Sequence, residues 1–251
     1  MKVLILAAGF STRLYPLTKN FPKALLEVGG KPIIEYLTDE LVQISKIDEM
    51  AIVSNKRYLK LFEHWLDKKY PTKTIKLISN QVTSPETRLG AVYDLKFGLE
   101  RLNWYSDQVM VLASDTVAAV KIRELIDYSE KNIDSVVNVV YNTKDTEDIK
   151  NKLGCVQLDG ESIIKFWEKP EKPETTFTSV PYYIFPPEAL KLIKVFTRQN
   201  LKGDSPGYFI AWLMGKYPVI AYKIDNYYYD SNTIESYNKL KEMVGDHRLK
   251  I

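Results

Sequence analysis

Residues 3–36 read VLILAAGFSTRLYPLTKNFPKALLEVGGKPIIEY, and this stretch decides the fold. It begins with a continuous apolar run over residues 3–8, which is typical of a central strand buried on both faces of a sheet. A long polar loop follows, over residues 9–22. Open α/β sheets bind ligands in loops at the carboxyl ends of such strands. The stretch therefore predicts an α/β fold with a ligand site beside its first loop.

The rest of the chain continues this alternation of strands and helices, which predicts a three-layer α/β sandwich. We expect further strands at residues 50–54, 74–78, 109–113, 136–141, 154–158, 162–167, 180–185 and 217–224. We expect helices at residues 32–44, 56–69, 88–102, 188–196 and 234–244. Because no linker rich in Gly, Ser or Pro divides the chain, we expect one domain over residues 1–251. Its second half, 120–251, would complete the pocket of the first half, 1–119.

Composition limits the chemistry available to this chain. It has 251 residues, of which 45% are hydrophobic and 27% charged, as in an ordinary globular protein. The single cysteine, Cys155, excludes an internal disulfide and a cysteine-based zinc site. The two histidines, His64 and His247, lie far apart, which argues against a histidine-rich metal site. Carboxylates, lysines, arginines and backbone amides must therefore carry any reaction.

Charge and hydropathy argue against nucleic-acid and membrane partners. The formal net charge is only +3, and acidic and basic residues are interspersed. No apolar run approaches the length of a membrane span, and no leader-like segment opens the chain. We therefore expect a cytoplasmic protein that binds neither nucleic acid nor membrane, and homo-oligomerisation stays open.

Small side chains in the first loop would let backbone N–H groups approach a phosphate. Gly9 and Ser11 are such residues, and Arg13 adds a fork of donors for phosphoryl oxygens. Lys23 follows within the same stretch. Gly9 alone is better explained by an ordinary strand-to-helix turn. Neither of the common phosphate motifs, G-x-G-x-x-G and G-x-x-x-x-G-K-[ST], is present.

Residues 3–36 as a whole resemble the sugar-nucleotide pyrophosphorylases. The signature of that family is an apolar strand followed by A-[AG]-G-x-G-[ST]-R-L-x-P-L-T, then P-K-x-L, then G-K-P-[IL]. The second loop glycine of the family is Ser11 here, and a positive φ at this position would strain a serine. The resemblance implies a Rossmann-like mixed sheet of the nucleotide-diphospho-sugar transferase type. It also implies magnesium-dependent transfer of a nucleotidyl group from a nucleoside triphosphate to a sugar-1-phosphate, with release of pyrophosphate.

The resemblance also assigns residues to the nucleotide. Arg13 would hold the leaving pyrophosphate, Lys23 would contact the region of the α-phosphate, and Asp115 would complete the catalytic group. The nucleotide-binding residues implied by the resemblance are Leu6, Ala8, Gly9, Ser11, Thr12 and Gly90.

Two aspartates are candidate ligands for Mg²⁺. Asp115 ends an apolar strand where the family has G-D-N, and Asp230 precedes the last helix where the family has W-x-D-x-G-T. Each aspartate alone would be explained by a turn or a helix cap. Both in the family's order predict a metal site, because Mg²⁺ is held by one or two carboxylates together with substrate phosphates.

The second half carries the residues expected at the sugar phosphate. Residues 166–170, FWEKP, resemble the family's F-x-E-K-P, so Glu168 would accept sugar hydroxyls and Lys169 would neutralise the sugar phosphate. Gly154 corresponds to the glycine of the family's Y-G-x-V element. Val180 and Tyr183 are expected in the strand that forms the next wall of the pocket.

The choice of substrates is the weakest part of the resemblance. Residues 84–91, SPETRLGA, stand where thymidylyltransferases usually show D-G-L-A-Q, and the familiar glutamine is absent. The chain also lacks the hexapeptide repeats of uridylyltransferases that act on N-acetylglucosamine-1-phosphate. We therefore expect dTTP and glucose-1-phosphate, with guanylyl, cytidylyl or uridylyl transfer, or a non-sugar phosphate acceptor, as alternatives.

Two other classes of protein stay open from the sequence. One is a catalytically silent regulatory paralogue that binds nucleotide sugars, which Ser11, Thr116 and the missing glutamine would suit. A Rossmann-type protein that binds a nicotinamide cofactor is disfavoured, because its glycine motif is absent.

Overall fold

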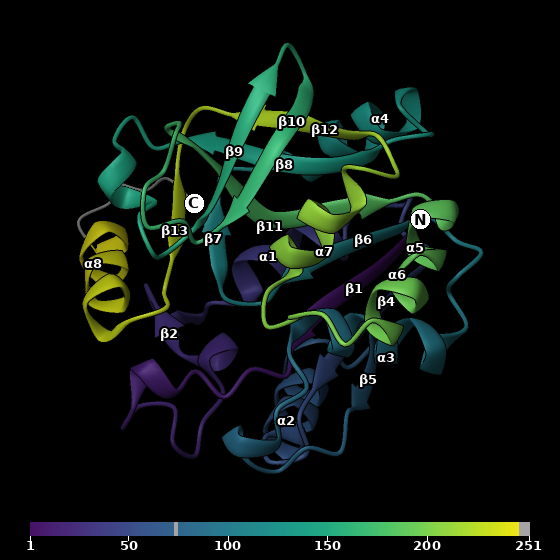
Figure 1. Cartoon of the computed structure of the whole chain (residues 1–251). Coiled ribbons are helices and arrows are strands. Elements are labelled where there is room, and N and C mark those ends of the chain that lie inside the picture. The colour runs from purple at the N-terminus through teal and green to yellow at the C-terminus, as the bar shows by residue number, and fades with distance from the viewer. Residues whose placement is uncertain (73–74, 246–251) are drawn as a thin grey trace.

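A mixed β-sheet forms the centre of the computed structural model, which describes residues 1–72 and 75–245 (Figure 1). Within these residues nine strands form the sheet, in the order β5-β4-β1-β6-β11-β8-β12-β10-β9. Their bounds in this order are Ile75–Ser79, Glu49–Ser54, Lys2–Ala7, Val109–Ala113, Phe177–Phe185, Val136–Asn142, Val219–Ile224, Ser162–Glu168 and Gly154–Asp159. Strands β5, β4, β1 and β6 run parallel, whereas β11 is antiparallel to both of its neighbours β6 and β8. The predicted mixed sheet is confirmed.

Helices cover both faces of the sheet because side chains alternate along its central strand. In β1, Val3 and Ile5 face one core and Leu4 faces the other. The first core is closed by α1 (Glu35–Leu41), α2 (Leu59–Lys69) and α4 (Ile122–Lys131). The second core is closed by α3 (Ala91–Leu102), α5 (Pro187–Lys191), α6 (Ile193–Arg198) and α7 (Pro206–Leu213). The predicted three-layer sandwich is therefore confirmed.

Several predicted elements have different bounds. The helix expected over residues 32–44 begins only at Glu35, because Lys31–Pro32 forms β3 and pairs with β2 (Glu27–Val28). The helix expected over residues 188–196 is divided into α5 and α6. Helices α4 and α7 were not predicted. Thr74, the first residue of the strand expected at 74–78, lies outside the described residues.

Strands of the second half close on themselves. The sheet order joins β11, β8, β12, β10 and β9, and β9 also pairs with β11. Gly154 of β9 lies at the point of closure, since it pairs with Glu168 of β10 on one side and Ser179 of β11 on the other. Because β11 also pairs with β6, the sheet continues from the first half into the second. This continuity supports the prediction of a single domain, which nothing else tests.

The last helix packs against the first loop. Helix α8 (Ile234–Gly245) lies beside β2 in Figure 1, where the ends of the colour scale meet. The hydroxyl of Tyr237 donates to the carbonyl of Glu27 at 2.7 Å, and a small apolar cluster joins Leu14, Val28 and Leu240. Two short strands, β7 (Thr116–Ala118) and β13 (Tyr228–Asp230), pair next to this cluster.

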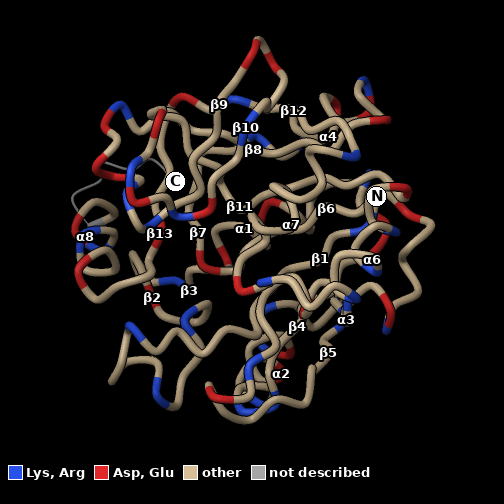
Figure 2. The backbone as a smooth tube through the Cα atoms, in the orientation of Figure 1, with Lys and Arg blue, Asp and Glu red and all other residues tan. Residues whose placement is uncertain are grey.

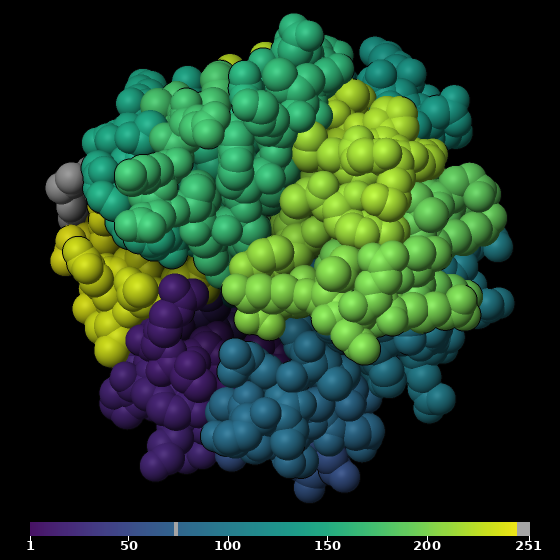
Figure 3. Space-filling model, in the orientation of Figure 1, coloured from purple at the N-terminus to yellow at the C-terminus, as the bar shows by residue number. Residues whose placement is uncertain are grey.

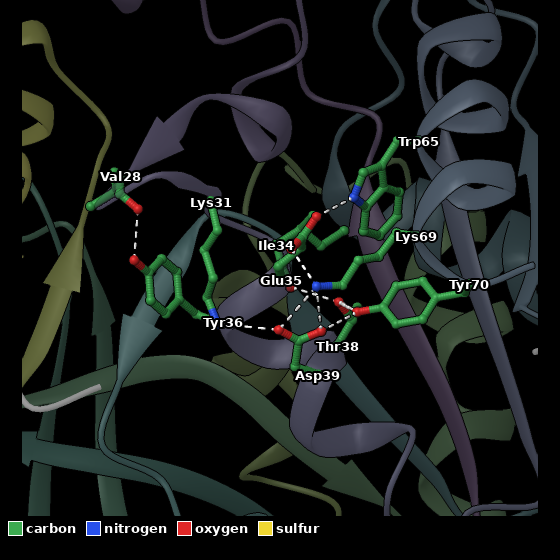
Figure 4. Close-up of polar contacts among 10 residues, drawn as sticks. All are labelled: Val28, Lys31, Ile34, Glu35, Tyr36, Thr38, Asp39, Trp65, Lys69 and Tyr70. Carbon is green, nitrogen blue, oxygen red and sulfur yellow. Dashed lines mark hydrogen bonds and ion pairs between the residues drawn. The ribbon is translucent and has the colours of Figure 1, made fainter.

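A polar network links α1 to α2 (Figure 4). Glu35 accepts hydrogen bonds from the indole of Trp65 at 2.8 Å and from Lys69 at 2.7 Å. Asp39 accepts a hydrogen bond from the hydroxyl of Tyr70 at 2.8 Å and also contacts Lys31. Each buried or half-buried carboxylate of this network therefore has both a neutral donor and a cation.

Acidic and basic residues are interspersed along the backbone, and no large region carries one sign alone (Figure 2). The central strands of the sheet are largely uncharged in the same view. Among the described residues, no helix combines the length and apolarity needed to cross a membrane.

Candidate functional site

A cavity of about 300 Å³ lies at the carboxyl ends of β1 and β6. Residues 6–9 line it from the first strand and loop, and residues 111–115 line it from the end of β6. The opposite wall comes from the second half, through β9, β10 and β11. Figure 3 shows that the first segments of the chain, in purple and blue, meet the green segments of the second half on one face of the molecule. The cavity thus lies where the sequence placed a ligand site.

The structure brings most of the predicted site residues together around this cavity. The predicted residues that line it are Leu6, Ala8, Gly9, Ser11, Arg13, Lys23, Gly90, Asp115, Gly154, Glu168, Lys169 and Asp230. Thr12 lies in the 3₁₀ turn η1 (Thr12–Leu14), exposed and outside the lining, although both of its neighbours line the cavity.

Val180 does not form the wall expected of it. Its side chain is 0% exposed and belongs to the core on the face of the sheet covered by α1, α2 and α4. Because side chains alternate along a strand, the cavity receives Ser179, Pro181 and Tyr183 of β11 instead. Of the two residues expected to form this wall, the structure places Tyr183 in the lining and Val180 in the core.

The backbone of Ser11 has the positive φ that was expected to strain a serine at this position. Its φ is 48° and its ψ 46°, in the left-handed region that favours glycine. The hydroxyl of Thr18 and the amide of Leu14 donate to the carbonyl of Ser11, at 2.8 and 2.9 Å. These bonds fix a backbone path that costs a residue with a Cβ about 1–2 kcal/mol.

Two buried side chains from the end of β4 hold the first loop in place. Asn55 donates its amide to the carbonyl of Ala8 at 3.0 Å, and the hydroxyl of Tyr58 donates to the carbonyl of Thr18 at 2.6 Å. Asn55 and Tyr58 are both 0% exposed. The sequence gave no sign of this support, because the contacts join segments about forty residues apart.

Two short strands bring Asp115 and Asp230 close together. Strand β7 pairs antiparallel with β13 and places Asp230 opposite Thr116, the residue after Asp115. The hydroxyl of Ser231 donates to the carbonyl of Asp115 at 3.0 Å. This pairing joins two carboxylates that are far apart in the sequence.

Lys23 is buried beside these carboxylates. Its ammonium forms an ion pair with Asp115 and donates a hydrogen bond to Oδ1 of Asn232 at 2.7 Å. The amide of Asn232 in turn donates to Asp230. Since Lys23 is only 4% exposed, its charge is poorly screened by solvent.

The carboxylate of Asp230 is incompletely satisfied. Among the described residues, none donates a hydrogen bond to its buried Oδ1. Desolvation raises the pKa of Asp230 to about 6, although the charge of Lys23 opposes this shift, and the charge of Asp115 adds to it. An oxygen without a donor beside a second carboxylate fits Mg²⁺, which prefers hard oxygen ligands and leaves its other positions to phosphates and water.

Glu168 and Lys169 follow each other at the end of β10. Burial raises the pKa of Glu168, and Lys169, whose ammonium lies 3.8 Å from Oε1, partly offsets this rise. Lys169 has a φ of 52°, so a second residue of the lining has a left-handed backbone. Gly154 lets the ring of Phe166 pack against the backbone of β9, because a Cβ at this position would lie 2.9 Å from that ring.

A loop before α7 completes the lining and was not predicted. Ser205 and Glu168 both line the cavity, and a Cβ on Gly207, the second residue of α7, would lie 1.9 Å from Oε2 of Glu168. At its other end the loop meets Gly90, whose φ is +96° and whose Cβ would lie 2.7 Å from the carbonyl of Gly203. The loop therefore connects the start of α3 with the end of β10.

Other lining residues were also missed. Asp94 is buried on α3, but it lies on the opposite side of the helix from the apolar stripe of Val92, Leu95 and Leu99, so helical periodicity gave no signal of its burial. Lys152 and Asn232 line the cavity from loops, where sequence periodicity carries no such signal.

A sequence model of the family described as nucleotidyl transferase matches residues 2–246. The chain is 28% identical to mannose-1-phosphate guanylyltransferase 1 of Arabidopsis thaliana over 78% of the chain and 52% of that protein. It is 27% identical to a UTP–glucose-1-phosphate uridylyltransferase of Haloferax volcanii, over 74% of the chain and 72% of that protein.

The fold comparison agrees with the sequence comparison. A crystal structure of a UDP-glucose pyrophosphorylase complexed with UDP-glucose aligns with a TM-score of 0.81 at 19% identity, covering 98% of this chain and 99% of that one. At this identity the alignment shows a shared fold only. The chain spans about half the length of the guanylyltransferase relatives it matches.

Proposed function

Since the chain belongs to the nucleotidyl transferase family, we propose that it transfers a nucleotidyl group from a nucleoside triphosphate to a sugar-1-phosphate. Family membership confirms the resemblance seen in residues 3–36. The observation that carries the proposal is the pair Asp115 and Asp230, one buried oxygen of which lacks a donor, beside the buried ammonium of Lys23. This group combines a metal site with a fixed cation, as phosphoryl transfer requires.

Mg²⁺ would be held by Asp115 and Asp230. When bound, the ion neutralises phosphate charge and orients the two substrates. The role of this chain is to keep two carboxylates at one place, through the pairing of β7 with β13. Asn232 assists by linking Asp230 to Lys23.

In the reaction, an oxygen of the sugar phosphate attacks the α-phosphorus of the triphosphate, and the bond to the leaving pyrophosphate breaks. No covalent enzyme intermediate is needed, so positioning and charge neutralisation are the main contributions of the protein. Arg13 would hold the pyrophosphate and Lys23 the region of the α-phosphate. Backbone groups of the first loop would face the triphosphate, and the other nucleotide contacts would come from Leu6, Ala8, Gly9, Ser11, Thr12 and Gly90.

The sugar phosphate would bind against the second half. Glu168 would accept hydrogen bonds from sugar hydroxyls, and Lys169 would neutralise the phosphate. The space left by Gly207 supports this role, because the carboxylate of Glu168 occupies it. Gly154 would let the sugar approach the backbone where β9, β10 and β11 meet.

The pair of substrates requires a direct test. The sequence predicts dTTP and glucose-1-phosphate, whereas relatives at 27–28% identity are named for guanylyl transfer to mannose-1-phosphate and uridylyl transfer to glucose-1-phosphate. We therefore suggest a panel of dTTP, GTP, UTP and CTP against both sugar phosphates, with Mg²⁺, measured by pyrophosphate release. A chain that releases no pyrophosphate with any pair would be the silent paralogue instead.

Two variants test the assignment of the site once a productive pair is known. Asp115→Ala and Arg13→Ala should each lower turnover by a factor on the order of 10² to 10³, the usual effect of removing one charge-stabilising group. Lys121→Ala is the matched control, because Lys121 is exposed and pairs only with the nearby Glu124 among the described ion pairs. Turnover close to wild type in either site variant would overturn the assignment.

A further inference from the structure

Asp94 is a buried carboxylate that lines the cavity and has no part in the mechanism proposed above. It lies one turn into α3, where its amide donates to the carbonyl of Gly90 at 2.9 Å. Its side chain is 7% exposed. A carboxylate at this position is unusual, because Gly98, one turn further along the same helix face, packs against the core side chains of Leu4 and Val53.

One oxygen of Asp94 is held by a fixed partner. The amide of Asn80 donates to Oδ1 of Asp94 at 2.7 Å, while Oδ1 of Asn80 accepts from the backbone of Val82 at 3.0 Å. Because Asn80 is held at both ends, its NH₂ group must face Asp94. Among the described residues, no donor reaches the second oxygen, Oδ2, and no ion pair includes Asp94.

The cations expected to bind phosphate act on Asp230 and not on Asp94. Lys23, Arg13 and Lys169 each lower the pKa of Asp230, whereas among the described residues only the hydrogen bond from Asn80 lowers the pKa of Asp94. Phosphates would be repelled by an isolated carboxylate and attracted to those three cations. Asp94 therefore lies at a part of the cavity suited to an uncharged portion of a ligand.

Protein structure alone does not account for an acid at this position. Burial raises the pKa of Asp94 to about 6, so ionisation at neutral pH lowers the stability of the folded chain. An asparagine of the same shape could turn its carbonyl toward Asn80 and keep the hydrogen bond without a charge. A costly ionisable group in a cavity, with one oxygen free, is typical of a binding residue.

We propose that Oδ2 of Asp94 accepts hydrogen bonds from an uncharged part of the substrate and thereby selects that substrate. Two parts of the expected substrates offer adjacent donors: the hydroxyls of the sugar ring, and the N–H groups of a base such as guanine. A carboxylate oxygen would accept hydrogen bonds equally from the sugar hydroxyls or from the N–H groups of the base. The inference rests on the proposed nucleotidyl transfer, because it assigns the specificity of that site.

The experiment measures kcat and both KM values for the wild type and for Asp94→Asn, with the productive pair found in the panel. The asparagine would present an NH₂ group to the substrate in place of an acceptor. We expect KM for one substrate to rise about 10- to 100-fold, with kcat at saturation within about threefold of wild type. A rise in KM for the sugar phosphate assigns the contact to the sugar, and a rise for the triphosphate assigns it to the base.

Glu40→Gln is the matched control. Glu40 is also a carboxylate with a raised pKa and one backbone donor, Ile122, but it is an exposed residue and borders a separate small cavity of about 20 Å³. Its substitution should leave both KM values unchanged. Thermal unfolding without ligand shows whether each variant folds, and Asp94→Ala provides a second test of the lost acceptor.

Three results would overturn the inference. Both KM values could stay at wild-type level in Asp94→Asn and Asp94→Ala. Both could rise equally together with a loss of thermal stability, which would indicate a damaged cavity. Glu40→Gln could raise the same KM as Asp94→Asn. A wild-type chain without turnover for any pair would instead contradict the proposed function itself, so the two failures are distinguishable.

Discussion

Buried carboxylates occur in two regions of this molecule, and their surroundings differ. Between α1 and α2, Glu35 and Asp39 are surrounded by donors: an indole, a phenol and two lysines (Figure 4). In the cavity, Asp94 and Asp230 each have an oxygen that no described residue contacts by hydrogen bond. The first region satisfies its own charges within the protein, and the second does not.

The ionisation of the two regions follows from this difference. Desolvation alone would raise the pKa of Asp39, but hydrogen bonds from Tyr70, Lys69 and Lys31 together lower it. For Asp94 and Asp230 desolvation prevails, and it raises the pKa of each to about 6. Satisfied carboxylates stabilise a fold, whereas incompletely satisfied ones are available to a ligand. The comparison thus separates structural acids from candidate functional acids.

The sharpest test of this separation exchanges one aspartate in each region for asparagine. Asp230→Asn should lower turnover by a factor on the order of 10² to 10³ while the chain stays folded, because it removes a charge that would hold Mg²⁺. Asp39→Asn should leave turnover near wild type and lower the melting temperature, because Lys31, Lys69 and Tyr70 lose a charged acceptor. Pyrophosphate release measures the turnover of both variants, and thermal unfolding measures their melting temperatures. Equal losses of turnover in the two variants would contradict the separation.

Asp94→Asn should raise stability at neutral pH. The pKa of Asp94 rises from 3.8 to about 6 on folding, so the folded chain binds this proton more tightly than the unfolded chain. Wild-type stability therefore falls as the pH rises from about 4 to about 6, and at pH 8 ionised Asp94 costs up to about 3 kcal/mol. Asparagine avoids this cost.

Urea unfolding of wild type and Asp94→Asn between pH 4 and pH 8 checks this prediction. The free energies of unfolding should differ by up to about 3 kcal/mol at pH 8 and converge near pH 4. An advantage of the variant that is independent of pH would show that its origin is packing and not ionisation.

Glu35→Gln should have the opposite effect on stability. The amide could still accept the bond from Trp65, but the ion pair of Glu35 with Lys69 at 2.7 Å would be lost. We expect the free energy of unfolding to fall by about 2 kcal/mol, since a hydrogen bond to a buried charge typically contributes 1.5–3 kcal/mol. Turnover should not change. Lys46→Ala is a suitable control, because its ion pairs with Asp127 and Glu130 are exposed and contribute little. If Lys46→Ala lowered the free energy of unfolding as much as Glu35→Gln, the buried ion pair would contribute no more than the exposed ones.

The sequence predicted the sheet and the location of the site because both depend on local patterns. Residues 3–8 are apolar without interruption, and a loop must leave the end of such a strand. Helix α7 was not predicted, because its sequence, PGYFIAWL, is apolar on every side and shows no helical period. Helix α4 had a clear period, through Ile122, Leu125 and Ile126, and could have been found.

Contacts between distant segments could not be predicted from local patterns. Strands β7 and β13 have only three residues each, too few to show an alternation, yet their pairing brings Asp115 and Asp230 together. Val180 was expected at the same wall as Tyr183, but residues three apart along a strand face opposite sides of the sheet, and Val180 faces the other core. Family resemblance supplied the order of these residues, and the fold supplied their geometry.

The smallest expected effect concerns the backbone of the cavity, where Ser11 adds strain to a region already destabilised by its carboxylates. Glycine at position 11 would relieve about 1–2 kcal/mol of left-handed strain and add about 0.5–1 kcal/mol of chain entropy to the unfolded state. We therefore expect Ser11→Gly to raise the free energy of unfolding by about 0.5–1 kcal/mol. Lys144→Gly is the control, because Lys144 has a similar φ of 67° in an exposed turn outside the cavity lining.

Both glycine variants should gain stability equally, since the strain is a property of the backbone and not of the site. Turnover of Ser11→Gly should stay within about threefold of wild type if the first loop binds the triphosphate through backbone amides, because the hydroxyl would then be dispensable. Urea unfolding and pyrophosphate release measure the two quantities. A large loss of turnover in Ser11→Gly, with stability gained as expected, would mean that the serine hydroxyl itself contacts the nucleotide. The left-handed serine would then be a binding residue that the fold tolerates at the same kind of cost as Asp94.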